Sequence, residues 1–128
     1  MKVFIKKLGK NECGYRKGQP DGAGKFIFIY KSWYSMFPFL SPRIKDDNKI
    51  IRFRLLSGEE IGLNLVYHNS KICMSRDNGR DEIRLYRNSA LNNALDIDTG
   101  VIIIIIQLDN HLYGMEAVQV NDADYYDI

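Results

Sequence analysis

Six consecutive β-branched residues, Val101 to Ile106, constrain the fold more than any other feature of this chain. Such side chains are stiff at χ1 and favour extended backbone. The run contains no polar residue, so it does not alternate as a strand with one wet face would. It is also far shorter than the roughly 20 apolar residues that a membrane-spanning helix needs, and no membrane association is expected. The stretch 101–108 therefore predicts a fully buried central β-strand.

Six further segments have the pattern of strands, which makes the predicted fold mostly β. They alternate between apolar and polar residues, or form short apolar runs between clusters of turn residues. These strands are expected at residues 1–7, 25–30, 48–56, 60–68, 82–87 and 112–120. Two short α-helices are predicted, one over residues 32–37 that Pro38 would end, and one over residues 89–95 capped by Asn88 or Ser89. Seven strands with two short helices indicate an open β-barrel.

The length and the charge distribution bound the organisation of the chain. Its 128 residues are expected to form a single domain with a real core, ending in an acidic tail at 121–128 that should fray. Residues 1–87 hold all 18 Lys and Arg and nine acidic residues, a net charge of +9, whereas residues 88–128 carry −7. This polarity favours a polyanion-binding face opposite an acidic one, although uneven composition without a function is the alternative.

No residue pattern predicts a metal or redox centre, and no cofactor is expected. Cys13 and Cys73 are far apart and outside any CxxC motif, so they are expected to be free thiols of a cytoplasmic chain. The N-terminus lacks the long apolar core of a signal peptide. His68 and His111 have no metal-ligand spacing. The absence of such motifs favours a non-catalytic recognition domain over an enzyme.

Two long polar loops stand out between the predicted strands. The first, residues 8–25, holds five of the ten glycines together with Pro20, so no regular structure is expected there. The second begins at Ser70, has Asn78-Gly79 at its centre and continues into the strand 82–87. Long loops in compact domains are usually functional. Both mix basic with acidic and amide side chains, which suits the reading of bases better than the binding of phosphates alone. A solvated surface loop is the alternative in each case.

The order of several short motifs resembles a known family. Residues 6–29, KKLGKNECGYRKGQPDGAGKFIFI, resemble the opening of the N-terminal effector-binding domain of EcoRII-type restriction endonucleases. The matching positions are Leu8, Asn11, Glu12, Gly14, Gly18, Gly24, Phe37 and Pro38. Further on, VYHNSK resembles that family's Tyr-x-Asn-Ser-basic segment, and RDEIRLYR resembles its Glu-x-Arg-Leu strand through Glu82, Arg84 and Leu85. The similarity extends from about Ile5 to Val120.

This resemblance implies a fold, a function and a set of contact residues. The fold would be a DNA-binding pseudobarrel, shared with the plant B-three transcription-factor domains, in which two arms grip the major groove. The implied partner is double-stranded DNA with a short specific site, and a nuclease catalytic domain would be a second partner. The implied contact residues are Lys10, Asn11, Glu12, Tyr15, Arg16, Lys17 and Gln19 in the first arm, and Lys71, Arg76, Asp77, Asn78, Arg80, Glu82 and Arg84 in the second.

General chemistry gives each residue type of this set a role. Arginines would donate two hydrogen bonds to guanine, and carboxylates would accept a hydrogen bond from the amino group of cytosine. Asn or Gln would form hydrogen bonds with adenine. Lysines, with Lys7 among them, would hold the register on phosphates. Two other functions remain open: a protein-interaction barrel without DNA binding, and a small metal-dependent nuclease. The latter has only formal PD-(D/E)xK candidates, Pro20-Asp21 and Asp47 with Lys49.

Overall fold

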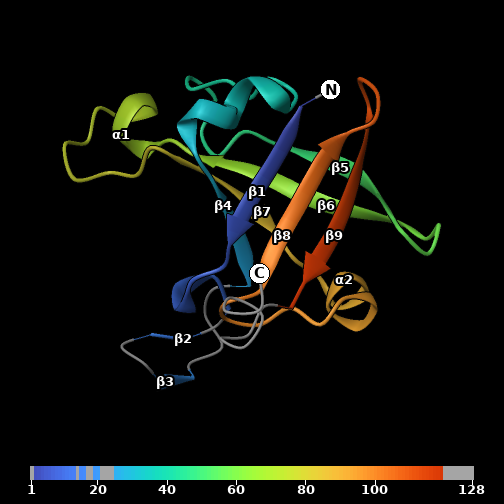
Figure 1. Cartoon of the computed structure of the whole chain (residues 1–128). Coiled ribbons are helices and arrows are strands. Elements are labelled where there is room, and N and C mark those ends of the chain that lie inside the picture. Colours follow the sequence, from blue (N-terminus) through green and yellow to red (C-terminus); the bar gives the residue numbers. More distant parts are fainter. Residues whose placement is uncertain (1, 14, 17–18, 21–24, 120–128) are drawn as a thin grey trace.

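A computed structural model of the chain describes residues 2–13 and 25–119, and the backbone of residues 15–16 and 19–20. Within this part of the chain, seven strands form one mixed sheet that curls into a half-barrel (Figure 1). The strands are β1 (Val3–Lys7), β4 (Phe26–Ile29), β5 (Asn48–Leu55), β6 (Glu60–His68), β7 (Glu82–Tyr86), β8 (Ile102–Gln107) and β9 (Leu112–Val118). Their spatial order is β1-β8-β9-β5-β6-β7-β4, and only β5 and β9 pair in parallel. The predicted mostly β, seven-stranded open barrel is confirmed.

The helices agree with the sequence prediction in part. Helix α2 (Ser89–Ala94) is capped as expected, because the side chain of Asn88 accepts a hydrogen bond from the backbone N–H of Leu91 at 3.0 Å. The predicted helix over residues 32–37 is a 3₁₀-helix, η2 (Lys31–Met36). A third short helix, α1 (Ser70–Cys73), lies where only a loop was predicted. Among the described residues, no helix is long and apolar enough to cross a membrane.

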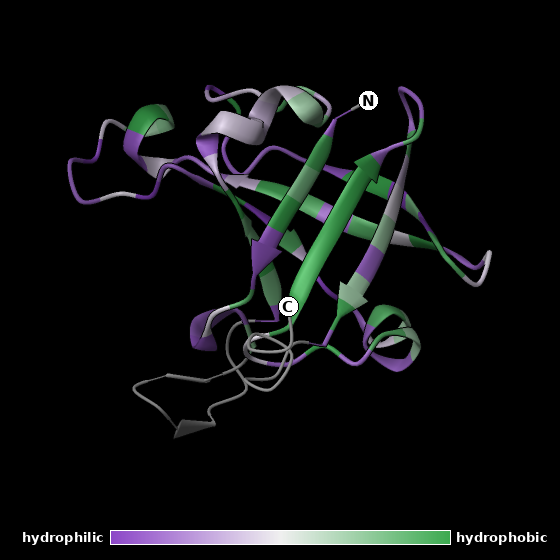
Figure 2. Cartoon of the chain, in the orientation of Figure 1, coloured by the Kyte–Doolittle hydropathy of each residue, from purple (hydrophilic) through white to green (hydrophobic). Residues whose placement is uncertain are grey.

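Strand β8 differs from the prediction of a fully buried central strand. It is second from one edge of the sheet, between β1 and β9. Ile103 and Ile105 are fully buried, whereas Ile102, Ile104 and Ile106 are only half-buried on the opposite face. Figure 2 shows apolar residues along the whole of β8, on the side of the molecule turned toward the viewer. The prediction was wrong because no further layer of the described chain covers the outer face of β8.

The core fills the inside of the curled sheet and is covered at one end by η2 and the segment after it. Phe4, Phe53 and Tyr113 are among its largest fully buried side chains. The Tyr113 hydroxyl donates to the backbone carbonyl of Met36 at 2.8 Å, and the Phe37 ring stacks on Tyr113 with centroids 5.3 Å apart. These contacts fix η2 on the sheet, since a buried hydroxyl needs a partner and the stacked rings exclude water.

The sheet remains open between its two edge strands, β1 and β4, and a buried ion pair bridges this seam. Lys6 of β1 lies 2.7 Å from the carboxylate of Glu12, and both side chains are almost fully buried. The same Glu12 carboxylate accepts the backbone N–H of Phe28 at 2.8 Å, and the Lys6 amine donates to the Phe28 carbonyl at 3.1 Å. Two side chains thus satisfy the edge of β4 where a neighbouring strand would otherwise pair.

Candidate nucleic-acid interface

The two loops that the sequence predicted as arms leave the sheet on the same side. In Figure 1, α1 and the short pair β2 (Tyr15–Arg16) and β3 (Gln19–Pro20) both extend to the left, above and below β4 and β7. We call these regions the N-arm (residues 10–20) and the C-arm (residues 70–81). Strands β4 and β7 lie between the two arms in this view.

The C-arm is a folded unit rather than an open loop. After α1 the chain turns back at Asn78-Gly79, so that the Lys71 N–H donates to the Arg80 carbonyl at 3.0 Å and the Arg80 N–H donates to Ser70 Oγ at 2.9 Å. Gly79 lies so close to α1 that an added Cβ would be 2.6 Å from the Lys71 nitrogen. The sequence predicted a polar loop centred on Asn78-Gly79, but the close approach that demands glycine follows only from the packing on α1.

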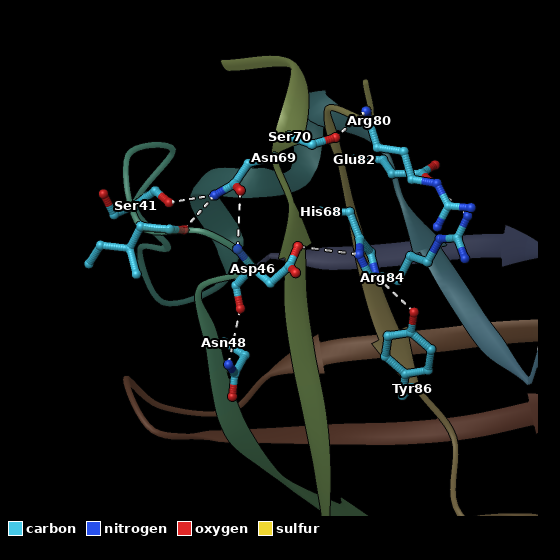
Figure 3. A network of polar contacts seen from close by, with 11 residues as sticks. Ser41, Asp46, Asn48, His68, Asn69, Ser70, Arg80, Glu82, Arg84 and Tyr86 are labelled. Atoms are coloured by element: carbon cyan, nitrogen blue, oxygen red, sulfur yellow. Dashed lines mark hydrogen bonds and ion pairs between the residues drawn. The ribbon is translucent and has the colours of Figure 1, made fainter. Parts of the chain in front are cut away.

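Asn69 fastens the base of the C-arm to the loop at residues 41–47. Its side chain is fully buried; the amide nitrogen donates to the carbonyls of Ser41 and Ile44, at 3.0 and 2.7 Å, and the oxygen accepts the Asp46 N–H at 3.1 Å (Figure 3). The Asn69 carbonyl accepts the N–H groups of the first turn of α1. Sequence reasoning did not identify this residue, although an Asn before Ser70 is a recognisable helix-start signal.

Asp81 anchors the other end of the C-arm to the body. The Tyr67 hydroxyl donates to one carboxylate oxygen of Asp81 at 2.5 Å, and the Lys31 amine donates to the other at 2.9 Å. The Tyr67 hydroxyl, and to a lesser degree Lys31, hold the pKa of Asp81 below its ordinary value. Burial and the Asp81 contact raise the pKa of Tyr67, which remains a hydrogen-bond donor at neutral pH.

Three charged side chains at the start of β7 form a row beside the C-arm, which we call the β7 row: Arg80, Glu82 and Arg84. Glu82 lies between the two arginines, 2.7 Å from Arg84 Nη2 and 3.8 Å from Arg80 Nε (Figure 3). The Arg84 guanidinium also lies over the Phe26 ring, with its Cζ 4.1 Å from the ring centroid. Arg84 is therefore held on two sides, whereas the Arg80 side chain is 59% exposed and reachable from solvent.

His68 and Tyr86 extend this surface onto β6 and the end of β7. His68 Nε2 and the Tyr86 hydroxyl share a hydrogen bond of 2.7 Å, and His68 Nδ1 is 3.7 Å from the Asp46 carboxylate (Figure 3). Burial lowers the pKa of His68, and the neighbouring Arg84 lowers it further. The lowered pKa favours the neutral form of the imidazole. No local pattern indicates this pair, because His68 and Tyr86 meet only through the pairing of β6 with β7.

The remaining predicted contact residues of the C-arm all lie at the surface. Lys71, Arg76, Asp77 and Asn78 are exposed, and no ion pair holds any of them among the described residues. The C-arm thus presents basic, acidic and amide groups together. This is the mixture that the sequence interpretation attributed to base reading.

The N-arm agrees less well with the prediction. Residues 10–13 form a 3₁₀-helix, η1, and β2 pairs with β3, so the expected absence of regular structure was wrong for these segments. Lys10 and Asn11 are exposed, as a DNA contact would require. Lys17 lies outside the described residues, as do the side chains of Tyr15, Arg16 and Gln19.

Glu12 does not lie where a base contact needs it. Its side chain is buried, and its carboxylate already accepts from Lys6, from the Phe28 N–H and from the Gly9 N–H. The position of Glu12 on the loop suggested an exposed acceptor, but the seam between β1 and β4 uses its carboxylate fully. We therefore assign Glu12 to the closure of the barrel and not to the DNA contact.

Two of the residues that formally resemble a nuclease motif, Asp47 and Lys49, are engaged elsewhere, and Asp21 lies outside the described residues. The Asp47 carboxylate accepts the Ser41 N–H at 2.7 Å, and the Lys49 amine donates to the Phe39 carbonyl at 2.9 Å. In the described part of the chain, no three or more His, Cys, Asp or Glu residues gather as metal ligands would.

Comparison with known proteins adds no family to these observations. No protein-family model matches the chain, and no curated protein is similar to it at a significant level.

Proposed function

We propose that this chain recognises a short specific site in double-stranded DNA, with the C-arm and the β7 row in the major groove and the N-arm beside them. The observation that carries this proposal is the C-arm itself. A glycine-dependent turn, the buried Asn69 and the Asp81 anchor hold it in place. The exposed side chains of its central turn and of Lys71 have no ion-pair partner among the described residues, and Arg80 has only a long one, 3.8 Å from Glu82. A binding element is expected to have a rigid frame and unengaged polar tips.

The chemistry of the outward groups favours duplex DNA over a simple polyanion. Arg76 and Arg80 can each donate two hydrogen bonds to guanine, and Glu82 can accept from cytosine. Lys71 and Lys10 would contact phosphates. The net charge of +9 in residues 1–87 supports attraction to the backbone. The resemblance to EcoRII-type effector domains makes a restriction endonuclease the proposed context, with this chain as its non-catalytic recognition domain.

Binding to duplex DNA at several salt concentrations tests this function. Fluorescence anisotropy with a mixed-sequence duplex of about 20 base pairs should give an affinity that falls steeply with salt, by roughly one log unit per log unit of salt for each phosphate contacted. Arg80→Ala should weaken binding, whereas Arg52→Ala should not, because Arg52 lies on β5 and is paired with Glu60 at 2.7 Å. The absence of binding at low salt would remove the proposal.

A protein-interaction role is the second candidate, and one observation favours it. The outer face of β1, β8 and β9 exposes aliphatic side chains that the chain's own elements do not cover within the described residues. A chain with this role alone would bind no duplex, and the Arg80 substitution would change no measured affinity for DNA.

A further inference from the structure

The outer face of β1, β8, β9 and β5 has the apolar character of an interface. Ile5 on β1 is 60% exposed and pairs in register with Ile104 on β8, which is itself half-buried. Leu108 and Val118 are also exposed. Isolated exposed aliphatic residues are ordinary on a protein surface, but a contiguous apolar patch across neighbouring strands marks a contact site.

A groove of about 340 Å³ is set into this face at Gly114 of β9. Ile104, Ile106 and Leu108 form its apolar wall, and Leu56 forms its rim on the side of the β5–β6 turn. The depression exists because Gly114 has no side chain between Arg54 on β5 and Ile106 on β8.

No contact among the described residues requires glycine at position 114. An added Cβ would make only ordinary contacts, 3.7 Å from Leu108 and 3.8 Å from the Arg54 carbonyl, and no positive φ is found there. Glycine in the middle of a strand weakens the sheet, and it often marks a place that another molecule approaches closely. The space above Gly114 is therefore best explained by a group from outside the described fold.

The face carries both halves of a self-complementary contact. Leu56 is 87% exposed, the highest value among the large hydrophobic residues, and it stands next to the groove that an aliphatic side chain would fill. Arg54 and Glu116 both line the groove and have opposite charges. Among the described residues Arg54 has only a long ion pair, 3.8 Å from Glu60, and Glu116 has none. In a two-fold pair the same patch of each copy faces the other. Leu56 of one copy can then enter the groove of the second copy, and Arg54 of one copy can face Glu116 of the other.

We propose that the chain self-associates through this face as a two-fold pair, each copy placing Leu56 into the partner copy's groove over Gly114, with Arg54 facing Glu116. The proposal does not depend on DNA binding. In Figure 1 the β5–β6 turn projects to the right and the C-arm to the left, so the pairing leaves the C-arm uncovered.

Sedimentation velocity without DNA tests the pairing. The full chain should change from monomer to dimer as its concentration rises through the micromolar range, which is typical of small interfaces. Leu56→Asp should abolish the dimer, and Gly114→Val should do the same by filling the groove with a side chain that suits a strand. Ile44→Asp is the matched control, because Ile44 is 58% exposed on the loop at residues 41–47 and should leave the dimer unchanged.

Charge reversal distinguishes this face from a non-specific apolar contact. Arg54→Glu should weaken the dimer by at least roughly tenfold, and the double variant with Glu116→Arg should restore it. A chain that stays monomeric at all concentrations overturns the proposal, as does a dimer that neither Leu56→Asp nor Gly114→Val affects. DNA binding should be unchanged in the Leu56→Asp monomer. The dimer proposal and the DNA-binding proposal can therefore be refuted independently.

Discussion

The amine of Lys6 lies 2.7 Å from the carboxylate of Glu12 at the seam between β1 and β4, where no strand pairing of the described residues closes the barrel. Both groups also bind the backbone of Phe28 on the opposite edge strand. The pair therefore holds β1 and β4 together, and it fixes the root of the N-arm relative to β4.

Glu12→Gln should destabilise the protein by about 3 kcal/mol, because it leaves the buried Lys6 amine without its counter-charge. Urea unfolding followed by fluorescence measures this loss. Glu59→Gln is the control, since Glu59 is exposed on the β5–β6 turn. A variant of normal stability that has lost DNA binding would contradict the structural role of Glu12 and would support the base contact originally predicted.

Gly79→Ala should weaken DNA binding by roughly tenfold or more, a loss of about 1.4 kcal/mol of binding free energy. The melting temperature should change little. The new Cβ would collide with the backbone of Lys71, so the Asn78-Gly79 turn has to leave α1. Gly58→Ala is a matched control on the other side of the molecule. Gly58 has φ +93° but no neighbour within 4 Å, so its substitution should strain the β5–β6 turn and leave binding intact. Equal binding by both variants would exclude a role for the C-arm.

Asp81 should make the free energy of unfolding depend on pH in the acidic range. The pKa of Asp81 is lowered in the folded state, so its ionised form stabilises the fold. This contribution is present above the ordinary carboxyl pKa and disappears as the pH falls through the lowered folded value. The free energy of unfolding should therefore fall more steeply below about pH 5 in the wild type than in Asp81→Asn. Asp77→Asn, at an exposed position of the C-arm, should follow the wild type; parallel curves for all three proteins would contradict the anchor.

Glu82→Gln should relax sequence preference without loss of general affinity. Glu82 lies between Arg80 and Arg84 and is the acceptor of the β7 row. Its replacement removes a group that selects cytosine, at a cost of about 1–3 kcal/mol of discrimination at one base pair. Competition binding with single-base variants of the preferred duplex measures this. Glu60→Gln, which changes a carboxylate paired with Arg52 on β5, should alter no base preference.

Much of the fold could be predicted because its signals are local. Alternation or short apolar runs located all seven main-sheet strands, and Asn88 located the start of α2, since these patterns lie within a few neighbouring residues. The exceptions depend on distant contacts. The outer face of β8 is half-exposed because of the order in which the strands pair, and a run of isoleucines does not predict that order.

The candidate site could be predicted at the level of its loops and less well at the level of its residues. The polar composition around Asn78-Gly79 identified the C-arm. The burial of Glu12 and the buried frame made by Asn69 depend on partners up to 28 positions away. Sequence spacing alone therefore could not distinguish the residues that hold the arms in place from the residues that the arms expose for contact with DNA.

Selection from a randomised duplex library, with sequencing of the bound fraction, tests the central claim most directly. The wild-type chain should enrich one short motif, and Arg80→Ala should lose the preference at a guanine within it while still binding DNA weakly. A bound fraction with the composition of the starting library, or a motif unchanged by substitution of Arg76, Arg80 and Glu82 together, would contradict DNA recognition by these arms.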